Sequence, residues 1–335
     1  MRKSPILAAV SICLFALAVT GCSAQRHTGS TASAEPTEHV APVTSYAPYV
    51  SATDDSDTDT SGSPTTLNLA FVISDSDNCT PTWDGTSSIG STTVKSRINR
   101  LKRNGATVRV SFGGADGTEL ARACDSASAL AAAYGEALDA AGSEQADFDI
   151  EGDTLTDSAS VNRRSAAIAL LQHERRGLEV TFTLPVMPSG LDSDAVALLE
   201  SANEHDVQVS TVNIMAMNYG ASYDDDMGDY AIAAAEATQR QLKEVFGLSD
   251  AMAWRGMALT AMLGVNDAAG ETFTLSDAGQ VRTFAEERQI GWVSMWATFR
   301  DRQCEDGNSE QNDPATDCSG VKQGTGTFSE AFGGH

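Results

Sequence analysis

The sequence is poor in positive charge and in histidine. Lys and Arg number 22 against 46 Asp and Glu, so the formal net charge is −24 at pH 7. A surface of this sign repels phosphate backbones, and no cluster of basic residues offsets it, which argues against nucleic acid as a partner. The five histidines are scattered without HExxH or HxH spacing. We therefore expect no histidine-built zinc site, and the sequence predicts no metal and no cofactor.

A long apolar run that could cross a membrane comfortably is also lacking. The run at 6–19 follows Arg2 and Lys3 and has the length of a signal-peptide core, so residues 1–21 are assigned as a signal peptide. Its end, Val-Thr-Gly-Cys22, resembles the lipobox of bacterial lipoproteins, in which the cysteine is lipidated after cleavage. An ordinary signal peptide with a chance cysteine is the alternative. We expect an extracytoplasmic protein at the cell surface, anchored to the membrane by lipid.

Residues 22–43 have almost no bulky apolar side chains and are rich in Ser, Thr, Ala, Glu and Pro. Burial cannot offset the entropy of ordering such a segment, so we predict a flexible tether. The remaining residues, 44–335, have a length that suits one large α/β barrel domain. We expect this domain to be a monomer.

Four cysteines lie in the domain at 44–335: Cys79, Cys124, Cys304 and Cys318. An even number in an exported protein indicates disulfides, and four cysteines allow three pairings. We favour Cys79 with Cys124, because they flank consecutive predicted elements. We favour Cys304 with Cys318, because they share one polar, loop-like segment.

Strand and helix patterns alternate along the domain. Repeated βα units favour an α/β fold with a parallel sheet closed into a (β/α)8 TIM barrel, with a doubly wound open sheet as the alternative. The first crossover helix is expected to be reduced or missing, because residues 51–66 form an acidic stretch without an apolar helical face. The predicted strands are Tyr46–Val50, Leu67–Ile73, Thr107–Phe112, Ala146–Glu151, Leu178–Pro185, Thr211–Met217, Met257–Leu263 and Trp292–Trp296, and the predicted helices are Ser91–Arg103, Ser126–Ala141, Ser158–Arg175, Ser193–Asn203, Tyr230–Phe246 and Ser276–Glu287.

Three carboxylates recur with period two in the fourth predicted strand. Asp147, Asp149 and Glu151 therefore share one face of it, and the two apolar residues between them share the other. If the apolar pair packs against helices, the acids point inward. Like charges this close cannot all ionise, so at least one carboxyl group should have a raised pKa, which is the usual preparation for a general acid. The alternatives are a solvated edge strand and a divalent metal site.

The acidic strand resembles the DxxDxDxE signature of glycoside hydrolase family 18, which contains chitinases and endo-β-N-acetylglucosaminidases. Glu144 stands where the first Asp of the signature is usual. Three further segments are similar to the family in the expected order, and the similarity runs from about residue 46 to 329. These segments are VSFGG at 110–114, MAMNY at 215–219 and SMW at 294–296. The resemblance is strongest to bacterial secreted chitinases with a compact barrel.

The resemblance implies a role for each acid. Glu151 would protonate the glycosidic oxygen and then activate water. The nucleophile would be the carbonyl oxygen of the sugar's own N-acetyl group, which makes this family an exception to the two-carboxylate scheme and retains the anomeric configuration. Asp149 would orient and support the acetamido group, and Asp147 could share a proton with Asp149.

Other residues take roles by the same resemblance. Tyr219 would donate its hydroxyl to the acetamido carbonyl, and Trp296 would stack beneath the sugar. Asn218 replaces an Asp found in many relatives; an amide still hydrogen-bonds the sugar but cannot shift neighbouring pKa values by charge, so the pH of peak activity could differ. The remaining candidate substrate-binding residues are Gly113 and Gly114, as space beside the acids or plain turn glycines, Tyr46, as an aromatic at a strand end, and Met187 and Met217, as site walls or core fillers.

The expected function is hydrolysis of β-1,4 bonds between N-acetylglucosamine units in chitin or chito-oligosaccharides. Two alternatives stay open. An endo-β-N-acetylglucosaminidase would cut the chitobiose core of N-glycans with the same acidic strand. A non-catalytic carbohydrate-binding barrel would keep the fold, but its simplest marker, loss of the acid at position 151, is not found.

Overall fold

The computed structural model describes residues 43–76, 78–305, 313–314 and 316–334. The predicted signal peptide at 1–21, the predicted lipidation site Cys22 and the predicted tether up to residue 42 lie outside them. Where the chain is described, no helix combines the length and the apolar character needed to cross a membrane.

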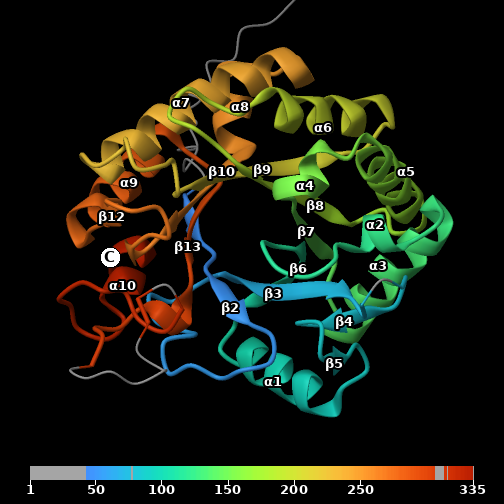
Figure 1. Ribbon diagram of the computed structural model, residues 1–335, viewed down its shortest axis with the longest axis horizontal. Helices are drawn as coiled ribbons and strands as arrows, with labels where there is room; N and C mark the ends of the chain where they lie inside the picture. Colours follow the sequence, from blue (N-terminus) through green and yellow to red (C-terminus); the bar gives the residue numbers. More distant parts are fainter. Residues whose placement is uncertain (1–42, 77, 306–312, 315, 335) are drawn as a thin grey trace, which may run out of the picture. The chain divides into compact units, whose positions relative to one another are not determined.

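A ladder of parallel strands forms the centre of the fold (Figure 1). Successive strands of the chain are neighbours in the ladder, and each pair is parallel. This order arises when each crossover helix returns the chain to the start of the next strand. The ladder contains seven of the predicted strands, namely β3 (Thr66–Ser74), β6 (Thr107–Gly113), β7 (Gln145–Asp149), β8 (Glu179–Pro185), β9 (Val209–Ala216), β10 (Met257–Met262) and β13 (Trp292–Trp296).

The remaining predicted strand is divided in two. β1 (Ser45–Tyr46) pairs with β13, whereas β2 (Tyr49–Ser51) pairs with β3, and both pairings are parallel. The division includes Pro48, which has no backbone N–H to donate to a ladder. Its carbonyl still accepts the N–H of Asn68 at 2.9 Å. One segment of the chain, 45–51, therefore contacts the strands at both ends of the ladder.

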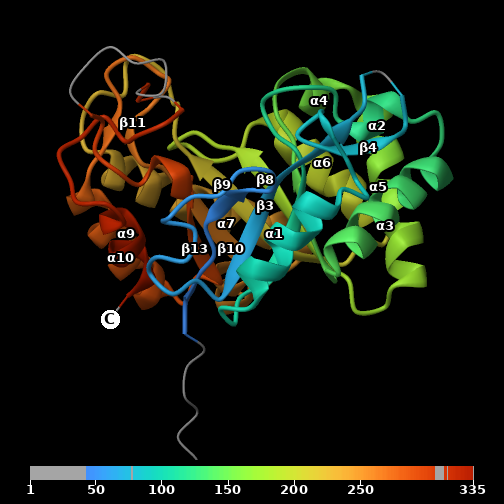
Figure 2. The same ribbon diagram turned by 90° about the horizontal axis from the view of Figure 1, so that it is seen from below.

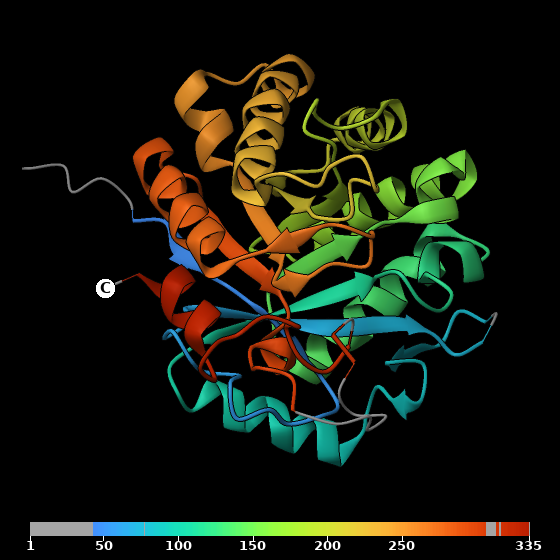
Figure 3. The ribbon, with the colours of Figure 1, turned by 60° about the vertical axis from the view of Figure 1, so that its left-hand side comes forward.

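Helices connect the strands and lie outside the ladder (Figures 1 and 3). All six predicted helices are present, and Ser91 and Ser126 cap their first turns through side-chain oxygens. One helix begins three residues before its predicted start, because Asp226 accepts the N–H of Asp229. The six are α1 (Thr92–Lys102), α3 (Ala127–Ala141), α5 (Ser158–Glu174), α6 (Ser193–Glu204), α7 (Met227–Phe246) and α9 (Leu275–Arg288).

The crossover between β2 and β3 contains no helix, as predicted. Its acidic residues are instead held against α1 by arginine. Arg97 donates from Nε to the carbonyl of Ser51 at 2.9 Å, and its guanidinium pairs with Asp55 at 2.5 Å and Asp59 at 3.0 Å. Arg100 pairs with the same Asp55. Ion pairing to α1 thus takes the place of an apolar helical face in this crossover.

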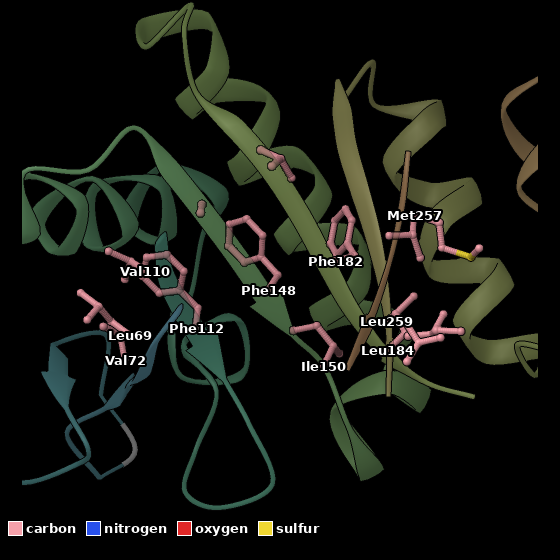
Figure 4. Packing of buried hydrophobic residues seen from close by; sticks show 14 of the residues in the cluster. Leu69, Val72, Val110, Phe112, Phe148, Ile150, Phe182, Leu184, Met257 and Leu259 are labelled. Atoms are coloured by element: carbon pink, nitrogen blue, oxygen red, sulfur yellow. The ribbon is translucent and has the colours of Figure 1, made fainter. Parts of the chain in front are cut away.

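Aromatic side chains fill the layer between the ladder and the helices. The rings of Phe112, Phe148 and Phe182 come from three adjacent strands and follow one another at centroid distances of 5.3 and 5.7 Å (Figure 4). Tyr134 of α3 packs against the first two. Because side chains alternate along a strand, burying Phe148 on this side turns its neighbours in sequence to the other side.

The predicted cysteine pairs are confirmed. Cys79 bonds to Cys124 and Cys304 bonds to Cys318. Sequence patterns missed several short elements, most of them in loops or at chain ends. They are β4 (Pro81–Trp83), β5 (Ser87–Ser88), α2 (Leu120–Ala123), α4 (Gly152–Thr156), α8 (Asp250–Arg255), β11 (Gly264–Val265), β12 (Thr272–Phe273), the 3-10 helix η1 (Thr298–Arg300) and α10 (Thr327–Gly333).

Candidate active site

The acids of β7 lie on the face opposite the aromatic layer. Asp147 is completely buried and Asp149 is 5% exposed. The strand ends at Asp149, two residues earlier than predicted, and Glu151 follows as the N-cap residue of α4. Figure 2 shows α4 at the end of the ladder where β11 also lies. The acidic face therefore leads from the buried interior to the loops that follow the strands, which is where α/β barrels carry their active sites.

Asp147 is held by hydroxyl groups from three other strands. Thr183 donates to Oδ1 at 2.6 Å, Tyr49 donates to Oδ2 at 2.9 Å, and Ser111 also donates to Oδ2. Burial raises the pKa of Asp147, while these hydrogen bonds and the charge of Arg109 oppose the rise. A carboxyl group with this many donors is fixed in orientation.

The hydrogen bonds continue around the interior. The Nδ2 of Asn213 donates to Oγ1 of Thr183 at 2.9 Å, and Thr260 donates to Oδ1 of Asn213 at 2.9 Å. Side chains from β6, β7, β8, β9 and β10 thus form one connected polar layer beneath Asp149. Such fully bonded layers make a buried carboxyl group rigid.

Asp149 and Glu151 form a coupled pair at the mouth of this layer. They share a hydrogen bond. Burial, the charge of Glu151 and the charge of Asp147 raise the pKa of Asp149 far above its usual range. Its Oδ1 is buried and has no hydrogen-bond partner among the described residues. Asp149 is therefore protonated more readily than an ordinary aspartate, and its Oδ1 can bind a polar group of a ligand.

The surroundings of Glu151 raise its pKa toward neutral pH. Burial is the largest cause that raises its pKa to about 7, and repulsion from Asp116 and Asp267 adds to it, whereas the hydrogen bond with Asp149 opposes the rise. Asp116 lies in the loop after β6 and Asp267 in the loop between β11 and β12. A carboxyl group that titrates near 7 can donate a proton and later take one back, as a general acid and base must.

Tyr219 is buried beside a second carboxylate. Its hydroxyl has no hydrogen-bond partner among the described residues, and its ring packs against Tyr223 and Tyr230. Burial and the charge of Glu271 raise the pKa of Tyr219, so the hydroxyl keeps its proton. It is available as a donor to a ligand.

Asn218 forms hydrogen bonds with a neighbouring loop. Its Oδ1 accepts the N–H groups of Asp267 at 3.0 Å and Ala268 at 3.2 Å, and its Nδ2 donates to Asp267 Oδ2 at 3.1 Å. The amide therefore holds the loop between β11 and β12. Sugar binding by Asn218 stays a prediction, with its oxygen already engaged in the loop.

Trp296 lies beside the polar layer at the end of β13. Its ring stacks on Phe71 at 5.6 Å and meets Tyr49 edge-on at 5.9 Å. The Trp296 side chain is only half-buried. Part of its surface is accessible to a ligand, which is consistent with the predicted sugar-stacking role.

The space beside the Cα atoms of Gly113 and Gly114 is occupied by other parts of the protein. Both have positive φ, 99° and 94°. A Cβ on Gly113 would lie 2.1 Å from the carbonyl oxygen of Asp149, and one on Gly114 would lie 2.9 Å from the ring of Phe71. Of the expected uses of this space, the structure shows the close approach of protein: these glycines allow the backbone of β7 and the Phe71 ring to approach β6, and contact of the glycines with a sugar ring stays a prediction.

The prediction that Tyr46 contacts the substrate is corrected by the structure. It is 2% exposed, and its ring stacks on Phe332 of α10, so it belongs to the core and not to a ligand surface. The nearby Tyr49 points to the acids instead. Met187 and Met217 are half-buried, and Met187 packs against the core. Their contact with substrate stays a prediction.

Sequence reasoning missed the charged residues in the loops. Asp116, Asp267 and Glu271 act on Glu151 or Tyr219 but lie far from them in sequence. The available signal was their position a few residues after a predicted strand, where barrel loops meet. Within the described residues, no group of three or more His, Cys, Asp or Glu residues is arranged to hold a metal ion.

Comparison with known proteins gives close relatives. No protein-family model matches the chain. It is 34% identical over 275 residues to a probable bifunctional chitinase/lysozyme of Escherichia coli, covering 76% of this chain and 31% of that protein. It is 34% identical over 247 residues to endochitinase 11 of Metarhizium anisopliae, covering 70% and 47%. The chain thus spans less than half the length of these curated relatives.

A solved structure matches over almost its full length. Active domain 2 of a Pyrococcus furiosus chitinase, in catalytic-site mutants complexed with chito-oligosaccharides, is 28% identical, with a TM-score of 0.75. The match covers 87% of this chain and 94% of that domain. Together with the acidic strand, these likenesses show that the chain belongs to glycoside hydrolase family 18 as a chitinase-like protein.

Proposed function

We propose that this protein hydrolyses β-1,4 bonds between N-acetylglucosamine units of chitin or chito-oligosaccharides, with retention of configuration. The observation that carries this proposal is the buried Asp149–Glu151 pair, in which Asp149 has an oxygen without a partner among the described residues and a pKa far above its usual range, and the pKa of Glu151 is raised to about 7. The name of the Pyrococcus relative and its chito-oligosaccharide complex support this class of substrate.

In the first step Glu151 donates its proton to the glycosidic oxygen as the bond to the anomeric carbon breaks. The acetamido carbonyl oxygen of the same sugar forms a bond to that carbon from the opposite face, which produces a cationic oxazolinium-type intermediate. In the second step Glu151, now a carboxylate, takes a proton from water while the water oxygen attacks the anomeric carbon. The acetamido group is restored, and Glu151 regains its proton.

The other acids would orient and stabilise the acetamido group. The buried, unpartnered Oδ1 of Asp149 can accept the acetamido N–H. Asp147 lies one layer deeper and is fixed by three hydroxyl groups, so its carboxyl group can support the cationic intermediate without moving. The Tyr219 hydroxyl would donate to the acetamido oxygen, and Trp296 would carry the sugar ring.

We further propose a closed (β/α)8 barrel, because segment 45–51 pairs with both β3 and β13. The proposed domain organisation is a lipoprotein signal peptide at 1–21, a lipidated Cys22 with a tether to 43, and a catalytic barrel at 44–335. The lipobox-like residues support an extracytoplasmic protein anchored at the cell surface. We propose a monomer that needs no cofactor.

The test offers N-acetylglucosamine oligomers and a high-mannose glycopeptide to residues 23–335 and follows the products by mass spectrometry. We expect shortened oligomers from the wild type, and a loss of about 10²- to 10⁴-fold in rate for Glu151→Gln, the range typical of a lost general acid. A glycan cut between its two core sugars would favour an endo-β-N-acetylglucosaminidase. Oligomer binding without any product would indicate a non-catalytic barrel.

A further inference from the structure

The Glu271 side chain is a buried carboxylate that the proposed mechanism does not use. It lies in the loop between β11 and β12 and is 1% exposed. Its Oε1 accepts the N–H of Gly220 at 2.7 Å, and the backbone groups of Asn218 and Tyr219 also oppose the rise in the pKa of Glu271 that burial causes. The backbone of three successive residues in the loop after β9 thus acts on one side chain, and Gly220 is hydrogen-bonded to it.

The backbone of this loop is shaped to receive an anion. Asn218 has a φ of 55° and Gly220 a φ of 110°. Residues with positive φ on either side of Tyr219 can turn successive N–H groups to one side and create a concave nest that binds anions. In this protein the nest is filled from within the chain, by Glu271.

A second set of hydrogen bonds joins the loop after β9 to the loop between β11 and β12. In this set the side chain belongs to the loop after β9. Asn218 Oδ1 accepts the backbone N–H groups of Asp267 and Ala268, a few residues before Glu271. The Glu271 backbone in turn donates to the carbonyl of Ala268 at 3.2 Å. Each loop therefore supplies a side-chain acceptor for the backbone of the other, and Tyr219 lies between the two points of attachment.

This arrangement determines the position of Tyr219. Its ring is packed against Tyr223 and Tyr230, and its backbone is held through the N–H bond of Gly220 to Glu271. We propose that Glu271 is a positioning residue that fixes the Tyr219 hydroxyl for the acetamido group of the substrate. This proposal rests on the hydrolytic function proposed above, because it needs Tyr219 to contact the substrate.

The second oxygen of Glu271 indicates that the residue is not there for stability alone. Oε2 is buried and has no hydrogen-bond partner among the described residues. A buried carboxylate oxygen without a donor is costly, so glutamine would serve a purely structural purpose at no greater cost. The charge of Glu271 also faces the Tyr219 phenol and disfavours its ionisation, which keeps the hydroxyl a donor.

A double-mutant cycle tests the proposal. The variants are Glu271→Gln, Tyr219→Phe and the double variant, assayed for kcat and KM on a chito-oligosaccharide. We expect Glu271→Gln to lower kcat about tenfold, the effect of weakening one charge-assisted hydrogen bond, with KM changed less than about twofold and the melting temperature not lowered. In the Tyr219→Phe background the same change should cost less than about twofold. The full tenfold loss in both backgrounds would overturn the proposal.

A matched control and a second readout complete the test. Glu200→Gln removes a charge from the exposed surface of α6 and should leave kcat unchanged. Hydrogen exchange followed by mass spectrometry should show faster exchange of a peptide covering 217–222 in Glu271→Ala than in the wild type, with a peptide from β8 unchanged. Equal exchange in the two proteins would refute the attachment of the loop. An inactive wild type with the expected exchange would refute only the hydrolytic function.

Discussion

The hydroxyl of Tyr49 lies 2.9 Å from Oδ2 of Asp147 and donates a hydrogen bond to it. The two residues are 98 positions apart, on β2 and β7. The ring of the same tyrosine meets Trp296 edge-on at 5.9 Å. One side chain of the divided first strand therefore contacts both the innermost acid and the aromatic residue that would carry the sugar.

Replacing Tyr49 with phenylalanine should separate these two contacts. Tyr49→Phe keeps the ring beside Trp296 and removes one of three donors to Asp147, which raises the pKa of Asp147 further. We expect a loss of about 1–2 kcal/mol in the free energy of unfolding, measured by urea at pH 7. Tyr223→Phe, in a half-buried loop position, serves as the control. Equal stability of the wild type and Tyr49→Phe would contradict the role of this hydrogen bond.

Activity should fall as pH rises through about 7. Glu151 must be protonated to donate to the leaving oxygen, and its pKa is raised to about 7, so the proton is lost above that pH. Asp116→Asn and Asp267→Asn each remove a repulsive charge and should move the alkaline limb of kcat/KM to lower pH. The measurement is a pH profile of hydrolysis for the three proteins. If the alkaline limb of kcat/KM lies at the same pH in both variants as in the wild type, these acids do not act on Glu151.

Ionisation of the buried Glu151 should lower the stability of the folded protein at high pH. Because the folded-state pKa of Glu151 lies above its usual value, the folded protein binds more protons than the unfolded chain between those two values. The contribution of Glu151 to stability is therefore lost as pH rises from about 4.5 to above 7. Glu151→Gln cannot ionise and should have a higher melting temperature than the wild type at pH 8, with a smaller difference at pH 4. A variant that melts lower than the wild type at pH 8 would argue against the raised pKa.

The ion pairs of the first crossover should differ in their contribution to the free energy of unfolding. Arg97 is 3% exposed, and its loss leaves the buried Asp59 without a cation, so Arg97→Ala should cost about 3–5 kcal/mol. Arg100 is 45% exposed and pairs with Asp55, which is 65% exposed. Arg100→Ala should cost about 0–1 kcal/mol. Urea unfolding of the two variants checks the contrast, which fails if their losses are equal.

Local sequence patterns were sufficient where the structure depends on local periodicity. The alternation at Asp147 and Asp149 predicted the inward acids, because the apolar residues between them must face the helices. The same pattern placed the end of β7 two residues too late, at Glu151. The helix that begins there, α4, has the sequence GDTLT, which is too short to carry a periodic signal.

The spacing of the two tyrosines in the first strand was sufficient to predict that they have different environments. Tyr46 and Tyr49 are three positions apart, so a regular strand directs them to opposite faces, and only one of them can face the acids. The contacts of Glu271 with the loop at 218–220 were beyond such reasoning. They join two loops about fifty residues apart, and no local pattern records which loops meet.

The division of the first strand affects the order in which the chain can fold. β2 finds its partner β3 within about twenty residues, but Ser45 bonds to Gly291, 246 positions later. A chain made from its N-terminus must therefore hold β1 without its partner until almost the whole sequence has been synthesised. Any chain that ends before β13 keeps β1 unpaired, so the first strand to be made is the last to be completed.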